Sequence, residues 1–263
     1  MHVYPIKTGR IRRGDSLVSI ALKALQSMDV KLVDGDVLAI SSKALSIIQG
    51  RIVALSTIRA SQNAEKIAEK YGLEPEFAEL VLREADIVYG GVNGALLTLK
   101  DGILTVNAGI DRKNAPTGYV ALWPERPWSE AWRIHEELKR RTGRHVGVII
   151  VDSHLAPLRL GTRGLALAVA GFTPVEDLRG RLDLYGKPLR ITRLSVADDL
   201  ASAAHLVMGE TDELTPMALI RDAPIKLTSK NMPNETLIAP SQCLYLGVLK
   251  ASQGGSLDEP RQP

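Results

Sequence analysis

The apolar run HVGVIIV, at residues 145–151, constrains the fold more than any other part of the sequence. A strand with one face in water alternates apolar and polar side chains, but this run carries no polar residue after its histidine. Its length suits a strand better than a helix, which usually needs roughly ten or more residues. We therefore predict a strand that other parts of the chain cover on both faces.

Other segments carry apolar residues at the spacing of an amphipathic helix. In the clearest of them, residues 195–208, Leu200 and Ala204 fall on one face, while Asp198 and His205 fall on the opposite face. A glycine after such a segment predicts its end, because glycine readily adopts the left-handed conformation of a helix terminus. The predicted helices are residues 17–28 (capped by Asp15 or Ser16), two between 61 and 85 (divided at Gly72, with Pro75 opening the second), 129–141 (before Gly143) and 195–208 (before Gly209).

Short apolar segments that are separated by turn residues predict hairpins. Residues 94–100 and 103–110 are joined by Asp101-Gly102, and an Asp-Gly pair between apolar runs is a strong hairpin signal. Hairpins mixed with helices favour an α+β fold over a doubly wound sheet. The other predicted strands are residues 2–6, 36–41, 216–222 and 243–249.

Composition excludes several classes of protein. The 33 basic and 30 acidic residues nearly balance, and aromatic residues make up only 4%, so nucleic acid is not an expected partner. No apolar segment approaches the roughly 20 residues that span a bilayer, and the first residues do not suggest a signal peptide. Cys243 is the only cysteine, which excludes intramolecular disulfides and favours a cytoplasmic protein. We expect one domain over residues 1–250 and a flexible tail over residues 251–263.

The common nucleotide-binding motifs are missing from the sequence. It contains neither a P-loop GxxxxGK[ST] nor a GxGxxG that opens a helix. The glycine-rich segment 90–94 precedes a predicted hairpin strand rather than a helix, so we interpret it as a tight turn. These motifs therefore give no support for a nucleotide site.

Three acidic positions could bind a metal ion. Asp111 and Asp152 each directly follow a predicted strand, where an open sheet offers a crevice, and Ser153 adds a hydroxyl beside Asp152. Glu210 lies just beyond the helix predicted for residues 195–208. Carboxylates and hydroxyls are hard oxygen donors, which suit Mg²⁺ or Mn²⁺ together with phosphates. Each acid also has a structural interpretation that involves no metal. Aspartates in such positions are commonly turn or helix caps, and Glu210 would suit a flexible surface loop.

Arginines recur through a loop-rich stretch that begins at residue 159. They would suit a clamp for phosphate or carboxylate groups, or they form a solvated basic face. The residues are Arg159, Arg163, Arg179, Arg181 and Arg190.

Five segments give the chain a resemblance to a known family. VNAGIDRKN carries Asp111, VGVIIVDS ends on Asp152 and Ser153, and SVADDLASAAHLVMGE ends on Glu210. With DGDVLAISSK and AVAGFTPVEDLRGRLDLYGKPL, in this order and spacing, they resemble the coenzyme F420-0:L-glutamate ligases, the CofE family of γ-glutamyl ligases. The resemblance extends from about Val3 to Leu249, nearly the whole chain.

The resemblance implies a mixed α/β, two-lobed fold in an intertwined homodimer. The enzyme would use GTP to add L-glutamate to a deazaflavin precursor, coenzyme F420-0, and neither nucleic acid nor a membrane would take part. Mg²⁺ or Mn²⁺ would accompany GTP, with K⁺ as a further candidate. By the same resemblance, the metal ligands are Asp111, Asp152, Ser153 (a threonine in the family) and Glu210, and the GTP-binding residues are Gly9, Ser42, Lys43, Ser46, Asn114, Met208, Gly209, Thr211 and Asp212.

The sequence departs from the family pattern at positions that matter for binding polyanions. Ile47 replaces a lysine expected near the nucleotide phosphates, and Ala156 replaces an arginine, so that only Arg159 of that segment keeps its charge. An aliphatic side chain cannot supply a cation, so phosphate binding must weaken or another cation must compensate.

Our working hypothesis is transfer of the γ-phosphoryl group to a substrate carboxylate, followed by attack of the glutamate amine on the acyl phosphate. Arg159 is the candidate catalytic residue, as a clamp for a carboxylate or a phosphate. Two alternatives stay open: a γ-glutamyl ligase for another acceptor, such as a folate-like compound, and a catalytically silent member that binds a nucleotide or deazaflavin. The departures at Ile47 and Ala156 favour the silent alternative.

Overall fold

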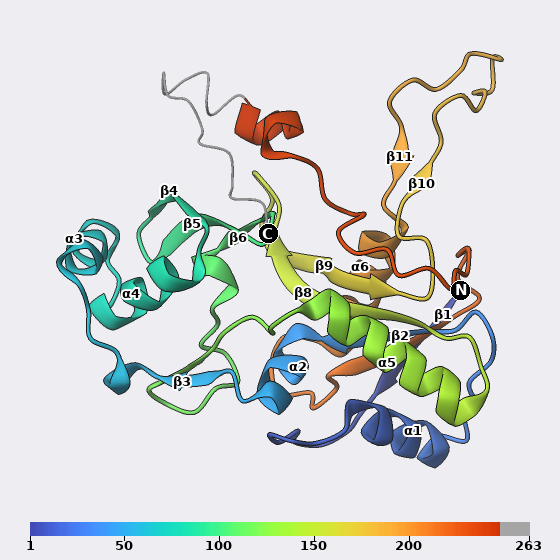
Figure 1. Cartoon of the computed structure of the whole chain (residues 1–263), viewed down its shortest axis with the longest axis horizontal. Helices are drawn as coiled ribbons and strands as arrows, with labels where there is room; N and C mark the ends of the chain where they lie inside the picture. The colour runs from blue at the N-terminus through green and yellow to red at the C-terminus, as the bar shows by residue number, and fades with distance from the viewer. Residues whose placement is uncertain (248–263) are drawn as a thin grey trace. The chain divides into compact units, whose positions relative to one another are not determined.

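The computed structural model describes residues 1–247, which form two compact units (Figure 1). Unit 1 comprises Met1–Val53 and Arg112–Thr236, and unit 2 comprises Ala54–Asp111 and the segment that begins at Leu237. The single domain predicted for residues 1–250 stays a prediction, and the tail predicted for residues 251–263 lies outside the described residues.

A five-stranded mixed sheet forms the centre of unit 1. Its order is β1 (His2–Ile6), β12 (Met217–Arg221), β2 (Val37–Ser41), β8 (Gly147–Leu155) and β9 (Thr162–Ala170). Every neighbouring pair is antiparallel except β2 and β8, which run parallel. A parallel pair needs a long crossover, and here more than a hundred residues, including all of Ala54–Asp111, separate the two strands. Mixed pairing with hairpins confirms the predicted α+β class.

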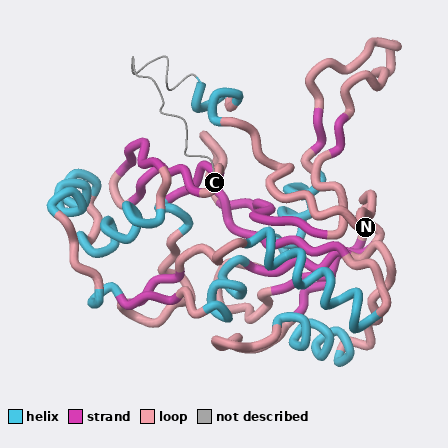
Figure 2. Tube along the Cα trace, viewed as in Figure 1, coloured by secondary structure: helices cyan, strands magenta, loops and turns pink. Residues whose placement is uncertain are grey.

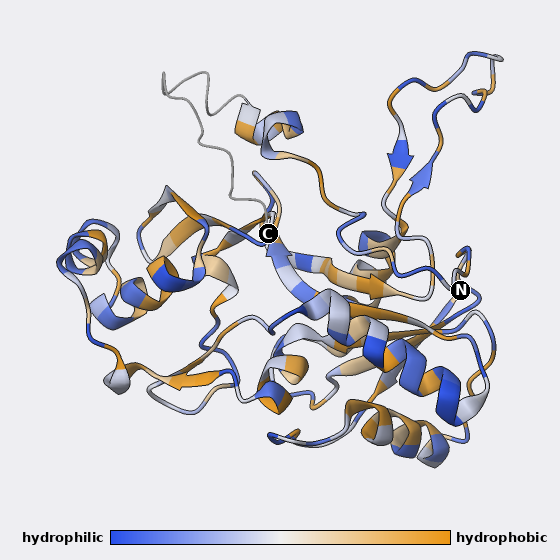
Figure 3. Cartoon of the chain, viewed as in Figure 1, coloured by the Kyte–Doolittle hydropathy of each residue, from blue (hydrophilic) through white to orange (hydrophobic). Residues whose placement is uncertain are grey.

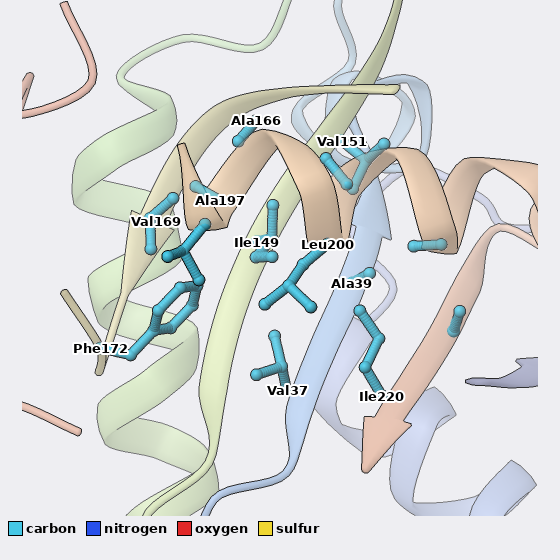
Figure 4. Close-up of a cluster of buried hydrophobic side chains, with 14 of the residues drawn as sticks. Val37, Ala39, Ile149, Val151, Ala166, Val169, Phe172, Ala197, Leu200 and Ile220 are labelled. Carbon is cyan, nitrogen blue, oxygen red and sulfur yellow. The ribbon is translucent and has the colours of Figure 1, made fainter. Parts of the chain in front are cut away.

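Helices cover both faces of β8, as predicted from its apolar run. Helix α6 (Val196–Met208) packs Leu200 and Ala204 against Ile149 and Val151 on one face (Figure 4). Helix α5 (Pro127–Thr142) lies on the other face, with Ile134 and Leu138 fully buried (Figures 1 and 4). Both helices end at the glycines expected from the sequence, Gly143 and Gly209.

The remaining helices of unit 1 follow their sequence signals. Helix α1 (Leu17–Ser27) begins after Ser16, whose hydroxyl accepts a hydrogen bond from the Ser19 amide. Helix α2 (Ser42–Gln49) ends at Gly50, which has a left-handed backbone conformation. The short strands β3 (Ile52–Ala54) and β7 (Tyr119–Ala121) pair with each other.

The contact between β9 and α6 depends on Gly164. A Cβ atom at this position would collide with the carbonyl group of Ala201, which belongs to the α6 backbone. We expect Gly164→Ala to lower the free energy of unfolding by about 1–3 kcal/mol, because a backbone cannot move aside as a side chain can. Urea unfolding would measure the loss.

The control for that variant is Gly161→Asn in the same hairpin. Gly161 has open space around its Cβ position, and asparagine tolerates its positive φ of 95° better than most residues. We expect this change to cost less than Gly164→Ala, and equal losses would contradict the proposed clash.

A long hairpin, the arm (residues 176–194), projects from the rest of unit 1 (Figures 1 and 2). Strands β10 (Glu176–Asp177) and β11 (Arg193–Leu194) pair at its base. Backbone hydrogen bonds continue outward through Gly180 N to Leu189 O (2.8 Å) and Asp183 N to Lys187 O (2.9 Å). The arm is therefore a built hairpin over its whole length.

The segment Ala54–Asp111 of unit 2 contains the α-helices α3 and α4 and a three-stranded antiparallel sheet. Helix α3 (Gln62–Tyr71) ends at Gly72, and α4 (Pro75–Glu84) has its proline in the first turn, both as predicted. In the sheet, β5 lies between β4 and β6, and Asp101-Gly102, both with positive φ, turns β5 into β6. The strands are β4 (Ile87–Val92), β5 (Ala95–Lys100) and β6 (Ile103–Val106).

Several sequence predictions were wrong in detail. Asp152 lies inside β8 rather than beyond it, because β8 stays paired with β9 as far as Leu155. Strand β6 ends at Val106, so a 3₁₀ turn at Asn107–Gly109 separates it from Asp111. Residues 244–247 are helical, whereas we predicted a strand over 243–249.

The interpretation of the glycine-rich segment 90–94 as a turn was correct only for its last two residues. Gly90 and Gly91 belong to β4, and the turn itself lies at Asn93-Gly94. Among residues 1–247, no helix is both long enough and apolar enough to cross a membrane.

Candidate functional site

Asp152 is held from two sides within unit 1. Ser42, at the start of α2, donates its hydroxyl to Oδ1 at 2.6 Å, and the Trp123 indole Nε1 donates to Oδ2 at 2.6 Å. Burial raises the pKa of the Asp152 carboxyl, and the bonds from Ser42 and Trp123 offset only part of that rise. Two hydrogen bonds therefore orient the carboxylate, but desolvation destabilises its ionised form, and a bound cation would relieve that cost.

The alternation of side chains along β8 separates Asp152 from Ser153. Ser153 pairs with Gly164, which packs against α6, so Ser153 lies on the face that α6 covers. Asp152 therefore points to the opposite face, where it meets Ser42 and Trp123. The side chains of Asp152 and Ser153 therefore cannot bind the same metal ion from one face of the sheet.

Glu210 is bound by three side chains on the α6 side of the sheet. Its Oε1 accepts from Thr162 Oγ1 at 2.9 Å and lies 2.6 Å from His205 Nε2, while Lys113 Nζ lies 2.6 Å from Oε2. Burial alone would raise the pKa of Glu210, but the bonds from Lys113, His205 and Thr162 outweigh it and lower the pKa to about 2. Glu210 therefore stays ionised at neutral pH.

Ser153 and Glu210 lie on the same face of the β8–β9 hairpin. Thr162, which binds Glu210, pairs with Leu155, two residues beyond Ser153 on β8. At about 3.3 Å per residue, that offset corresponds to roughly 7 Å along the strand. The Ser153 side chain therefore lies on the face of Glu210, while its backbone amide donates to the Asp152 carboxylate.

The loop after α6 folds back on itself beside Glu210. The Glu213 carboxylate accepts from Thr211 N at 2.8 Å and from Thr211 Oγ1 at 2.9 Å. Gly209 has a φ of 75°, a backbone conformation that favours glycine, and its Cβ position lies against that carboxylate. Asn114 donates its side-chain amide to the Thr211 carbonyl at 2.8 Å and ties the loop to the chain after Asp111.

Three segments predicted to bind nucleotide meet at this loop. Thr8 N, next to Gly9, donates to Leu214 O at 3.1 Å, and Ser41 N, just before Ser42 and Lys43, donates to Pro216 O at 2.8 Å. The structure therefore gathers the Gly9 segment, the start of α2 and the loop after Met208 in unit 1.

Not every predicted nucleotide-binding residue is accessible. Ser46 is 1% exposed and donates its hydroxyl to Ser42 O at 3.0 Å, and Met208 is also buried. Asp212 and Thr211 are exposed in the loop. The geometry favours the loop positions over Ser46 and the Met208 side chain for direct contact with a ligand.

Arg159 lies in the connection between β8 and β9, away from any regular element. Its side chain is exposed, and its amide donates to Ala156 O at 3.2 Å. Arg179 and Arg181, from the same predicted cationic group, instead bind Asp177 and Glu176 on the arm. The clamp role of Arg159 stays a prediction.

The donor set fits a hard divalent cation. Within the described part of the chain, His, Cys, Asp and Glu side chains form no group of three or more that could hold a metal. Mg²⁺ does not need such a group, because one or two carboxylates with water and phosphate oxygens commonly complete its shell. Asp152, Ser153 and Glu210 belong to unit 1 and Asp111 ends the first segment of unit 2, so their joint role stays a prediction.

Sequence reasoning missed four partners of the two carboxylates. They are Trp123 at Asp152, and Lys113, Thr162 and His205 at Glu210. Lys113 could have been noticed, since it precedes Asn114 in the motif VNAGIDRKN. His205 was placed on the polar face of its helix, but its bond to Glu210 depends on the turn at Gly209.

Comparisons with known proteins agree with the motifs. The sequence profile of the family F420-0:Gamma-glutamyl ligase matches residues 5–222. The protein named Coenzyme F420:L-glutamate ligase from Methanopyrus kandleri is 38% identical over 84% of this chain and 86% of its own length. Its namesakes from Methanothermobacter thermautotrophicus (38% identical; 80% of this chain and 84% of the relative) and Archaeoglobus fulgidus (35%; 84% and 87%) are similar over nearly the same span. These matches confirm the resemblance found in the sequence.

Proposed function

The chain belongs to the F420-0:gamma-glutamyl ligase family, whose members are carbon–nitrogen ligases, and we propose that it joins L-glutamate to coenzyme F420-0 at the expense of GTP. The observation that carries the proposal is the junction of the Gly9 segment, the start of α2 and the loop after Met208, with the ionised Glu210 in that loop. The cytoplasmic location expected from the single cysteine is part of the same proposal.

The residues of the site suit phosphoryl transfer to a carboxylate. An Mg²⁺ or Mn²⁺ ion at Glu210, one at Asp152 on the other face of β8, or both would neutralise phosphate charge. The loop at Thr211 and Asp212 is exposed and would contact the nucleotide, while Arg159 can clamp a carboxylate from the β8–β9 connection. An acyl phosphate formed in this way would be attacked by the amine of glutamate.

The decisive experiment supplies isotopically labelled glutamate, Mn²⁺, either GTP or ATP, and one of several acceptors. We expect a labelled amide product and one phosphate released per bond with coenzyme F420-0 and GTP. Product only with a folate-like acceptor would move the proposal to another γ-glutamyl ligase. Tight nucleotide binding in calorimetry, without phosphate release in any mixture, would support the silent alternative that Ile47 and Ala156 favour.

The arm suits the homodimer that we also propose. Its apolar side chains lie in water in the single chain, and apolar and polar segments alternate along it (Figure 3). Exposed apolar groups of this number on one projecting hairpin are typical of an interaction surface. The most exposed are Leu182, Leu184, Tyr185 and Ile191, at 67%, 100%, 86% and 85%.

We expect the double variant Leu184→Ser, Tyr185→Ser to weaken the dimer by about a hundredfold or more. Truncating a buried interface side chain typically costs over 1 kcal/mol, and each of these side chains occurs in both copies. Light scattering after size exclusion would measure the change. Leu206→Ser is the control, since Leu206 is 82% exposed on α6, outside the arm, and should leave the dimer intact. A monomeric wild-type protein would refute the proposed dimer.

A further inference from the structure

Lys113 occupies the one oxygen of Glu210 that the other side chains leave for a cation. Thr162 and His205 both bind Oε1, while Lys113 Nζ lies 2.6 Å from Oε2. A divalent ion at Glu210 would have to take Oε2, because two donors already fill the space around Oε1. A metal ion and an ammonium cannot share one carboxylate oxygen without strong repulsion at such short range.

The position of Lys113 allows its ammonium group to move. The Lys113 side chain is 52% exposed, so its head can leave Glu210 without crossing packed structure. Its neighbour Asn114 holds the Thr211 carbonyl at 2.8 Å, which keeps the backbone of this segment attached to the loop. A displaced Lys113 head therefore stays within one side-chain length of Glu210, roughly 6 Å.

We propose that Lys113 is an exchangeable cation: it neutralises Glu210 while the site is empty, and it turns to the nucleotide phosphates when a divalent ion takes its place. This inference rests on the proposed function, since it needs a metal–nucleotide complex at Glu210. The exchange leaves each charged group with a partner of opposite sign at each stage. Glu210 always has a cation, and the released ammonium meets the incoming polyanion.

The exchange predicts two effects of opposite sign for Lys113→Gln. Without nucleotide, the variant should bind Mn²⁺ about three- to tenfold more tightly, because no ammonium competes for Oε2. With Mn²⁺ present, it should bind a non-hydrolysable GTP analogue at least about tenfold more weakly, because a charge-assisted bond to phosphate is lost. Electron paramagnetic resonance of free Mn²⁺ and calorimetry of the analogue measure the two affinities.

Two further variants sharpen the test. Lys113→Arg keeps the charge and should leave both affinities within about threefold of wild type. Lys226→Gln breaks a similar ion pair, 2.7 Å from Glu176 on the arm, and should change neither affinity.

Each possible result separates the hypotheses. If Lys113 only supports the local structure, Lys113→Gln weakens both affinities, and the exchange is refuted while the metal site stands. Unchanged Mn²⁺ affinity in that variant also refutes the exchange. A wild-type protein that binds no Mn²⁺ overturns the proposed metal site and, with it, the role of Lys113.

Discussion

Replacing Asp152 with asparagine is expected to reduce ligase turnover by about a thousandfold or more, since a lost metal ligand removes several kcal/mol of charge stabilisation. The same variant should be at least as stable as wild type at pH 7. Asparagine has the shape of aspartate, its Oδ1 can still accept from Trp123, and the Ser42 hydroxyl can rotate to accept from the new amide. Activity would thus fall without any loss of folding.

The pH dependence of stability gives a second test of the same variant. Burial raises the pKa of Asp152. Its favourable contribution to the free energy of unfolding is therefore complete below the ordinary pKa of 3.8 and is lost as pH rises through the folded-state pKa. Asparagine cannot ionise and avoids that loss. Denaturant unfolding at several pH values should therefore show Asp152→Asn gaining on wild type as pH rises above 3.8.

Asp34→Asn is the matched control for Asp152→Asn. Asp34 is an exposed carboxylate that accepts from His145 N at 2.7 Å, and its pKa is lowered, chiefly by that bond. Its replacement should leave turnover within about twofold, since surface substitutions outside a site seldom change function. Turnover near the wild-type value in Asp152→Asn would remove Asp152 from the metal site.

Local sequence signals were sufficient for most helices and hairpins. Ser16, Gly72, Pro75 and Gly143 act through the backbone of their own helix, so their effect does not depend on distant parts of the chain. The predicted end of β8 came too early in the sequence. The strand continues through the polar residues Asp152 and Ser153 because it stays paired with β9, and their sequence alone does not reveal that pairing.

The sequence did not predict how the candidate site residues are arranged, and the metal-binding role of its acids stays a prediction. Asp152 and Ser153 are adjacent in sequence, yet β8 sends them to opposite faces once it extends past them. The bonds to Asp152 from Ser42 and Trp123 span 110 and 29 positions, and no local pattern encodes such contacts. Residues 244–247, which are helical, were predicted as part of a strand because CLYLGVL is a short apolar run, for which periodicity does not separate a strand from a helix.

Glu210→Gln should abolish Mn²⁺ binding and should lower turnover as Asp152→Asn does, but it should have the opposite effect on stability. The partners of Glu210 lower its pKa from the ordinary 4.5 to about 2, so its contribution is complete above pH 4.5 and is lost as pH falls toward 2. Without metal, at pH 7, the variant should lose on the order of 2 kcal/mol of unfolding free energy, after allowance for solvent screening. The glutamine side chain would also face the Lys113 ammonium either with its amide NH₂, which is a donor, or with an uncharged oxygen, so the charged hydrogen bond is lost in both cases.

Glu79→Gln isolates the electrostatic part of that prediction. Glu79 in unit 2 also has a pKa lowered to about 2, mainly by the Ser61 hydroxyl and amide and by Arg83, but no proposed ligand lies there. Both variants should therefore lose stability at pH 7 and approach wild type below pH 4.5, as urea titrations in EDTA would show. Only Glu210→Gln should also lose Mn²⁺ binding. A low pKa makes both carboxylates anionic, but only Glu210 lies beside the loop of Thr211, where we propose that the metal binds. Retained Mn²⁺ binding in Glu210→Gln would mean that Glu210 serves only as the partner of Lys113, His205 and Thr162.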